Sequence, residues 1–362
     1  MEISADGLVR LRLAAQSIDP IGGSDVAGTV RNLVAMQAQD FAGALWAVGL
    51  RTAGATRTTV LDALERGDVV RTLPMRGTLH FVASEDLRWM LGLTAQGTLQ
   101  SAASRFRNLG LDAEVLGRAR VLAQGALEGG NSLSREEFMT LLSANGIAPE
   151  GQRGYHVIFY LCQVQLICWG PPRGTQQALV LVDEWIAPTP ARDRQEALES
   201  FALRYFASHG PATEHDFAWW TKLTLRDIRT AIQGLGNRLS VLSHDGTDYY
   251  VAASALEGGT FDKLRDRDNR EVHLLPGFDE YLLGYQDRSL ALSDEHFQRV
   301  VPGNNGIFLP MIVSDGAIVG TWRRTAKSKT FEIKPEHFDD ATAAQLAGLQ
   351  SASADYVRFM AG

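Results

Sequence analysis

Apolar and polar positions alternate along the first ninety residues in a way that predicts short helices followed by two strands. The pattern predicts an amphipathic helix over about residues 7–17 and a second helix that begins after Ser24 as its N-cap. Asp40 and Thr58 are the expected N-caps of two further helices. The buried face of the second helix is expected to hold Val26, Val30, Leu33 and Val34.

Two β-leaning runs close this region. Residues 69–73 and 78–82 are rich in apolar residues, and Pro74-Met75-Arg76-Gly77 joins them. Helices followed by a β-hairpin are typical of the winged helix, a variant of the helix-turn-helix.

The same order recurs at about residue 134. Ser134 and Glu137 have the spacing of a capping box and predict the start of a helix. A helix from about Gly154 then runs into strands at 165–169 and 178–182.

A third stretch shows the same order of helices followed by two strands. Residues 211–213 are expected to open one helix, and Thr224 with Asp227 to open the next. Strands follow at 238–242 and 248–251, with the turn at Asp245-Gly246. The alternative is an unspecialised α+β protein in which three such stretches occur by chance.

The C-terminal part has a different pattern. Residues 307–333 are expected to be β-rich, with a hairpin at 314–317 and a final helix over about 341–359. A cationic run follows that hairpin and includes Arg323, Arg324, Lys327 and Lys329.

Composition narrows the class of protein. The chain has 362 residues, of which 45% are hydrophobic and 21% charged, as in globular proteins. It shows no long apolar run and no basic-then-apolar start, so we expect no membrane segment and a cytoplasmic, nucleoid-associated protein. The net charge of −7 argues against non-specific coating of DNA but permits one basic surface.

Few residues suggest a metal or a cofactor. Cys162 and Cys168 lie in an apolar run and are expected to be small buried hydrophobes rather than a zinc site or redox pair. The eight histidines are scattered, which favours structural or surface roles. Phosphate-binding loops and hydrolase or zinc motifs are absent from the sequence, so no metal or cofactor is implied.

One polar position interrupts the apolar series of the second helix. Continuing that series by three residues places Gln37 on the buried face, where an amide must find partners or line a cavity. Gln39 lies about 200° around an ideal helix from it, so both can line one pocket only if the helix ends near Ala38. Alternatively, Gln37 bonds backbone in the core and Gln39 is solvated.

Several segments together resemble the AlkZ-like winged-helix DNA glycosylases. The resemblance covers nearly the whole chain and implies three tandem winged helices in a C-shaped α+β molecule, with a concave DNA-binding face and a β-rich C-terminal segment. It also implies that Gln37 and Gln39, as the Gln-x-Gln motif, are catalytic. The segments that carry it are 36–40, 71–80, 210–213 with 216–220, and 275–284. The implied domains are a catalytic winged helix at 1–90, winged helices at 91–195 and 196–260, and the C-terminal region at 261–362.

Two neutral amides suit one kind of substrate. An N7-alkylated purine is already cationic, so its glycosidic bond is weak, and the amide oxygens of Gln37 and Gln39 need only hold water and stabilise an oxocarbenium-like sugar. The expected activity is therefore hydrolysis at alkylated purines, cross-link adducts included, by a monomer on double-stranded DNA. The motif has no adjacent lysine, so lyase activity is not expected.

Five basic residues are candidates for contact with the duplex. The alternative interpretation is that these residues form a solvated cationic face without a ligand. They are Arg76, Arg323, Arg324, Lys327 and Lys329.

Two other functions remain open from the sequence. One is a winged-helix transcription regulator or architectural DNA-binding protein without catalysis, which the amide pair counts against. The other is an interaction scaffold unrelated to nucleic acid, which fits the net charge but leaves the family segments unexplained.

Overall fold

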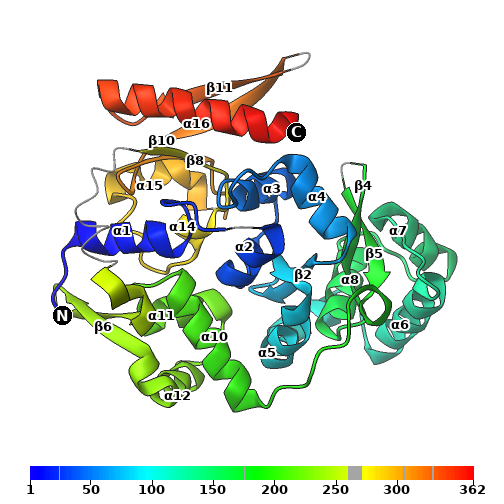
Figure 1. Cartoon of the computed structure of the whole chain (residues 1–362). Coiled ribbons are helices and arrows are strands. Elements are labelled where there is room, and N and C mark those ends of the chain that lie inside the picture. The colour runs from blue at the N-terminus through cyan, green and yellow to red at the C-terminus, as the bar shows by residue number, and fades with distance from the viewer. Residues whose placement is uncertain (24, 175, 260–270, 305, 328–329) are drawn as a thin grey trace. The chain divides into compact units, whose positions relative to one another are not determined.

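The computed structural model describes the whole chain except residues 24, 175, 260–270, 305 and 328–329 (Figure 1). It is a mixed structure of helices and antiparallel sheets. Internal contacts divide it into two units. The first is Met1–Val60, Leu198–Trp220 and Thr224–Gly362, and the second is Leu61–Ala197 with Thr221–Leu223. No helix among the described residues has both the length and the apolar run that crossing a bilayer would take.

Side-chain N-caps begin the N-terminal helices of the first unit. Asp40 caps α3, accepting a hydrogen bond from Ala42 N at 3.2 Å, as predicted. Asp25 caps α2, with Gly28 N at 2.8 Å from its Oδ1. The predicted cap, Ser24, lies outside the described residues. These helices are α1 (Ala5–Ala15), α2 (Val26–Leu33) and α3 (Phe41–Gly49).

Helix α4 (Arg57–Glu65) begins two residues earlier than predicted. Thr58 is already inside the helix, so its assignment as the N-cap is wrong. Thr56 takes that place, because its hydroxyl accepts from Thr59 N at 3.3 Å and its own N–H donates to the Thr59 hydroxyl at 2.9 Å.

The end of α2 also differs from the prediction. The helix stops at Leu33, and Val34 adopts a left-handed φ of 67°, which ends the α-helical path. Gln37 therefore lies in the short strand β1 (Met36–Gln37) and not on the helix. Neither a glycine nor a proline marks the end of α2, so the apolar pattern predicted a helix that continues through Gln37.

The β-rich C-terminal part is confirmed as an antiparallel sheet in the order β11-β10-β9-β8. Its β9–β10 turn is at Asp315-Gly316, where both φ angles are positive, as predicted. Helix α16 (Ala343–Ala361) packs on β8. The strands are β8 (Val272–Leu275), β9 (Met311–Ser314), β10 (Ala317–Lys327) and β11 (Thr330–His337).

The third predicted helix–hairpin stretch is also present. Thr224 caps α12, as predicted, accepting from Asp227 N at 3.1 Å. The elements of this stretch are α11 (Glu214–Thr221), α12 (Leu225–Leu235), β6 (Leu239–His244) and β7 (Thr247–Ala252), and the helix before them, α10 (Arg194–Ser208), was not predicted. Two short helices, α14 (Glu280–Leu283) and α15 (Asp294–Val300), follow.

A buried ion pair joins two distant segments of the first unit. Arg51, just after α3, donates two hydrogen bonds to the carboxylate of Asp279, at 2.7 and 2.9 Å. Both side chains are fully buried. The same guanidinium donates to Gln16 O and Ala47 O, so its charge is both paired and hydrogen-bonded.

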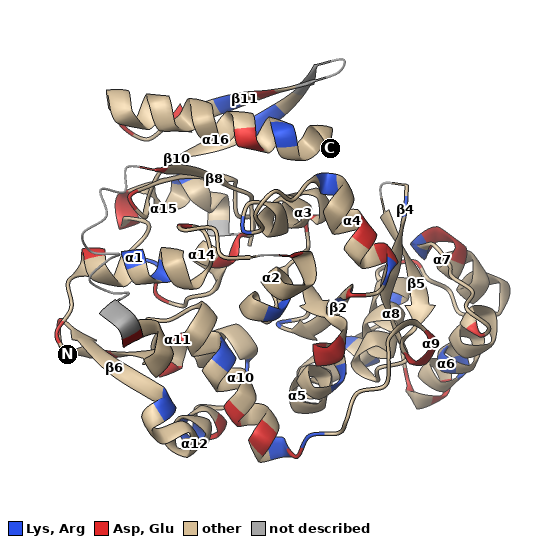
Figure 2. Ribbon diagram, in the orientation of Figure 1, with Lys and Arg blue, Asp and Glu red and all other residues tan. Residues whose placement is uncertain are grey.

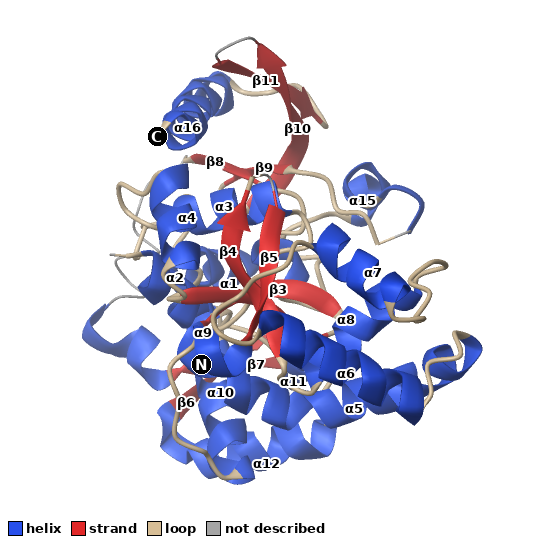
Figure 3. Cartoon of the chain, turned by 90° about the vertical axis from the view of Figure 1, so that its right-hand side faces the viewer, coloured by secondary structure: helices blue, strands red, loops and turns tan. Residues whose placement is uncertain are grey.

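The second unit holds an antiparallel sheet with the strand order β3-β2-β4-β5. The predicted hairpins are β2 (Val69–Met75) with β3 (Thr78–Ala83), and β4 (Ile167–Arg173) with β5 (Gln176–Leu181). Helices α6 and α8 contact the β4–β5 hairpin (Figure 3). The helices are α5 (Leu87–Asn108), α6 (Ala113–Leu127), α7 (Arg135–Ala144), α8 (Arg153–Gln163) and α9 (Val182–Trp185).

Local signals located α7 but not α5 or α6. Ser134 and Glu137 form the predicted capping box at the start of α7. The sequence analysis missed α5, where the apolar positions do not keep to one face, and α6.

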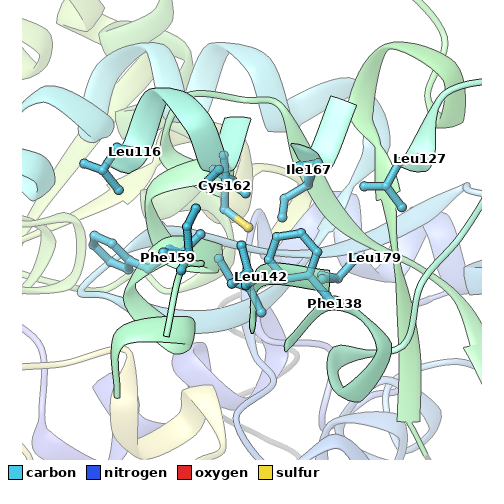
Figure 4. Close-up of a cluster of buried hydrophobic side chains, with 14 of the residues drawn as sticks. Leu116, Leu127, Phe138, Leu142, Phe159, Cys162, Ile167 and Leu179 are labelled. Atoms are coloured by element: carbon cyan, nitrogen blue, oxygen red, sulfur yellow. The ribbon is translucent and has the colours of Figure 1, made fainter. Parts of the chain in front are cut away.

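The cysteines are buried hydrophobes, as expected. Both are free and fully buried, and Cys162 lies in the core of the second unit among Phe138, Leu142 and Ile167 (Figure 4). Burial raises the pKa of Cys168 to about 12, so this thiol stays protonated and unreactive at neutral pH.

Replacing Arg51 tests the buried pair. We expect Arg51→Met to lower the free energy of unfolding by about 3–5 kcal/mol, because Asp279 would keep a buried charge without its partner. Urea denaturation measures the change. Arg358→Met is the control, since Arg358 and Asp355 form an exposed pair and should contribute less than about 1 kcal/mol. Equal losses in the two variants would contradict this account.

Candidate active site

The two glutamines lie in the segment between α2 and α3, with Gln37 at the end of β1 and Gln39 in a bend two residues later. Burial alternates along it: Met36 and Ala38 are buried, Gln37 is partly exposed and Gln39 is exposed. Gln37 and Gln39 are thus the solvent-accessible residues of this segment, while Met36 and Ala38 lie in the core.

This arrangement differs from the predicted one. A helix would have turned the two amides about 200° apart. Because α2 ends at Leu33, neither glutamine lies on a helix, and both residues are at least partly exposed to solvent. Parts of the alternative agree with the structure, since the Gln37 amide does bond a backbone N–H and Gln39 is exposed, but Gln37 is partly exposed and not in the core.

A hydrogen bond links the two residues directly. The backbone N–H of Gln39 donates to Gln37 Oε1 at 3.1 Å. This bond fixes the orientation of the Gln37 amide, whose oxygen retains a second lone pair for another donor such as water.

A buried carboxylate lies beneath this segment. Glu280, the first residue of α14, is only 2% exposed, and its Oε1 accepts from the backbone N–H of Gln37 at 2.9 Å. Its Oε2 accepts from Trp220 Nε1 at 2.8 Å and lies 3.6 Å from His209 Nε2. The candidate catalytic segment is thus held from its inner side by residues more than 170 positions away in sequence.

The segment that carries Glu280 fits closely against its neighbours. A Cβ on Gly277 would lie 2.5 Å from Phe308 O, so only glycine allows this approach. A Cβ on Gly43, in the first turn of α3, would lie 3.3 Å from Pro276 Cβ and 2.8 Å from a carboxylate oxygen of Asp40. Close backbone packing therefore places residues 276–280 against the start of α3.

The sequence analysis assigned no role to Glu280, Trp220 or His209. Two of them lie in the family segments 216–220 and 275–284, which was the available signal. His209 is fully buried and stacks on Tyr205 with centroids 4.8 Å apart, as a structural histidine would, yet it also lies beside the carboxylate.

The predicted cations of β10 fall on different faces. Arg324 shares the face of buried Trp322, and its Nη1 donates to the Tyr356 hydroxyl at 2.9 Å. Arg323 is exposed on the opposite face, directly across from exposed Lys334 on β11. Lys334 was not among the predicted residues.

The other two cations of that run lie at the limit of the described residues or outside them. Lys327 is the last residue of β10, and Lys329 lies outside the described residues. The run was taken as one surface in the sequence, whereas a strand divides it between two faces.

Arg76, at the β2–β3 turn of the second unit, contacts its own hairpin. Its Nη2 lies 2.9 Å from Nε2 of the fully buried His80, whose Nδ1 lies 2.8 Å from Thr78 O. Burial, and then the charge of Arg76, lower the pKa of Lys222. Arg76 thus belongs to a basic pair with Lys222, which the sequence analysis did not identify.

Charged residues are not segregated by sign. Figure 2 shows basic and acidic residues interspersed along the helices of each unit. This distribution agrees with the net charge of −7, and it leaves pairs such as Arg323 with Lys334 as local concentrations of positive charge.

One cluster among the described residues has groups that could hold a metal. Asp19, Glu271 and His273 have ligand atoms within 4.8 Å of one another. Burial, the largest cause, lowers the pKa of His273, which keeps a nitrogen free of a proton at neutral pH. The cluster lines a cavity of about 650 Å³ whose walls include α16 and neither Gln37 nor Gln39.

Comparisons with known proteins agree with the resemblance seen in the sequence. A family model described as DNA glycosylase AlkZ-like matches residues 30–359. An interstrand DNA cross-link repair glycosylase of Streptomyces sahachiroi is 26% identical over 326 residues, covering 86% of this chain and 85% of that protein. The solved structure of the Streptomyces sahachiroi DNA glycosylase AlkZ has a TM-score of 0.81 at 23% identity, covering 99% of this chain and 97% of that one, which shows the shared fold. Since the family model spans most of its length, the chain belongs to the AlkZ-like DNA glycosylase family.

Proposed function

We propose that this chain is a monomeric DNA glycosylase that hydrolyses the N-glycosidic bond of N7-alkylated purines in double-stranded DNA. The observation that carries the proposal is the pair of glutamines, Gln37 and Gln39, which are two residues apart, accessible to solvent and joined by a hydrogen bond. Family membership supports glycosylase chemistry, and the amide pair supports the choice of substrate.

The chemistry follows from what an amide can do. A neutral glutamine has no useful basicity, so it cannot activate water for attack on an ordinary nucleotide. An N7-alkylated purine carries a positive charge and leaves as a neutral base, so the transition state places its charge on the sugar. The oxygens of Gln37 and Gln39 can hold a water molecule and turn their negative dipole ends to that sugar. No metal or cofactor is needed for this step.

The substrate range extends to bulky and cross-linked adducts in this proposal. The similar protein of Streptomyces sahachiroi is named as an interstrand cross-link repair glycosylase. A pair of amides that is accessible to solvent does not require a deep pocket, so a large substituent on N7 can be accommodated. Such an activity would protect a cell that makes a DNA-alkylating natural product.

We also propose that the three helix–hairpin stretches act as winged helices. Each of the hairpins β2–β3, β4–β5 and β6–β7 follows helices in the chain. The boundaries 1–90, 91–195, 196–260 and 261–362, and the concave face for the duplex, remain predictions that belong to this proposal.

Base release from a defined lesion tests the proposed function. We expect Gln37→Ala and Gln39→Ala each to slow the release of N7-methylguanine from duplex DNA by about 10²–10³-fold, the loss typical of one transition-state dipole. Single-turnover rates at saturating enzyme measure this loss. Undamaged DNA should release no base.

Gln124→Ala is the matched control, since Gln124 is an exposed glutamine on α6 of the second unit. It should keep the wild-type rate. A double variant of Gln37 and Gln39 that released the base at full speed would contradict the assignment. A wild-type protein that bound DNA without releasing any base would favour the non-catalytic alternative.

Salt dependence tests the proposed contact of β10 and β11 with phosphate. Arg323→Ala and Lys334→Ala should each reduce the slope of log Kd against log salt by about one. Arg324→Ala should change the slope little, because its guanidinium is already bonded to Tyr356. Fluorescence anisotropy over a range of salt gives the slopes, and equal slopes for all three variants would refute the division into two faces.

A further inference from the structure

Glu280 is a buried acid directly beneath the proposed catalytic segment. It is 2% exposed, and it follows Asp279, whose side chain caps α14 and is paired with Arg51. A carboxylate is rarely buried to this extent unless its oxygens are hydrogen-bonded. The hydrogen-bond partners of Glu280 therefore indicate why a carboxylate is buried here.

The two carboxylate oxygens have different partners. Oε1 accepts from the backbone N–H of Gln37, and Oε2 accepts from the indole N–H of Trp220. The backbone oxygen of Glu280 accepts from the Gln16 side chain at 3.3 Å, and Gln16 in turn accepts from Arg51 at 3.1 Å. Glu280 is thus fixed at its side chain and its main chain.

The hydrogen bond between Glu280 and the Gln37 main chain is connected to both glutamine residues. It holds the main chain of Gln37, whose Oε1 receives the N–H of Gln39. A continuous series of hydrogen bonds therefore runs from the buried carboxylate to the two side chains that face outward. A shift of about 1 Å in a positioned group can cost about 10²-fold in rate.

We propose that Glu280 is a positioning residue, which sets the main chain of Gln37 and through it the orientation of the amide pair. This inference rests on the proposed function. Glu280 does not touch the substrate; it acts only through Gln37. A carboxylate suits this place better than an amide, because both of its oxygens can accept. The NH₂ group of a glutamine would face the N–H of Trp220, donor against donor.

A double-mutant cycle separates positioning from a general effect on folding. The variants are Glu280→Gln, Gln37→Ala and their combination, and the readout is single-turnover release of N7-methylguanine at saturating enzyme. We expect Glu280→Gln to slow the wild type by about 10²-fold. In the Gln37→Ala background it should slow release by less than about threefold, because residues that act through one another are not additive.

Two further measurements make the test specific. The Kd for DNA should change by less than about twofold, since the proposed role lies in the reaction and not in binding. Adding Trp220→Phe to Glu280→Gln should recover part of the rate, because it removes the opposing donor. It also provides a second variant if Glu280→Gln alone folds poorly.

Asp216→Asn is the control for the loss of a buried acid. Asp216 is 1% exposed and accepts from the backbone N–H groups of Thr213 and Gln286, and neither bond involves the glutamine segment. Thermal unfolding gives the folded fraction of each variant. Asp216→Asn should lose stability and keep the wild-type rate per folded molecule.

The outcomes distinguish the two proposals. A wild-type protein that releases no base would overturn the proposed function. With an active wild type, a full rate in Glu280→Gln, or losses that multiply with Gln37→Ala, would overturn the positioning role alone. A rate loss in Asp216→Asn equal to that of Glu280→Gln would do the same.

Discussion

The ion pair between Arg51 and Asp279 is the constraint on which the first unit depends. Both charges are removed from water, so neither side chain can move away without a large penalty, and the pair joins the end of α3 to the start of α14. Asp279 Oδ1 also accepts from Tyr281 N, which fixes the first turn of α14. Glu280 is therefore held where its carboxylate meets the Gln37 N–H. The position of the amide pair follows from a charge interaction that has no part in the chemistry itself.

The charged groups lie inside and the neutral amides face solvent. Under the proposed function, this arrangement gives a physical basis for selectivity between substrates. A carboxylate on the accessible face would be able to activate water against many nucleotides. In the structure the carboxylate is beneath the segment, with its oxygens occupied by Gln37 N–H and the indole of Trp220. What faces outward are two amides with no basicity, Gln37 and Gln39. If these amides are catalytic, as we propose, the site favours a substrate that brings its own positive charge.

Sequence patterns located features that are decided within a few residues. The caps Asp40 and Thr224, the Ser134–Glu137 capping box and the Asp315-Gly316 turn were all predicted, because each is a contact over two or three positions. The end of α2 was not, since Val34 takes a left-handed conformation that β-branched residues rarely adopt and that only tertiary packing can impose. The support of the candidate site was missed for a related reason. Glu280 is 243 positions from Gln37, and no spacing rule reaches that far.

The face of β10 that carries Arg323 holds a local concentration of positive charge in an acidic protein. Arg323 and Lys334 are direct neighbours across the β10–β11 pair, and like charges in that relation weaken a hairpin. Because this pairing lowers the stability of the hairpin, we propose that it serves to bind a ligand. A phosphate group between the two cations would offset their repulsion. Arg324, on the other face, instead stabilises the packing of the hairpin on Tyr356 of α16. The same strand thus separates a cation that is bonded to Tyr356 from an exposed cation that we propose contacts DNA, and the sequence of the basic run cannot distinguish them.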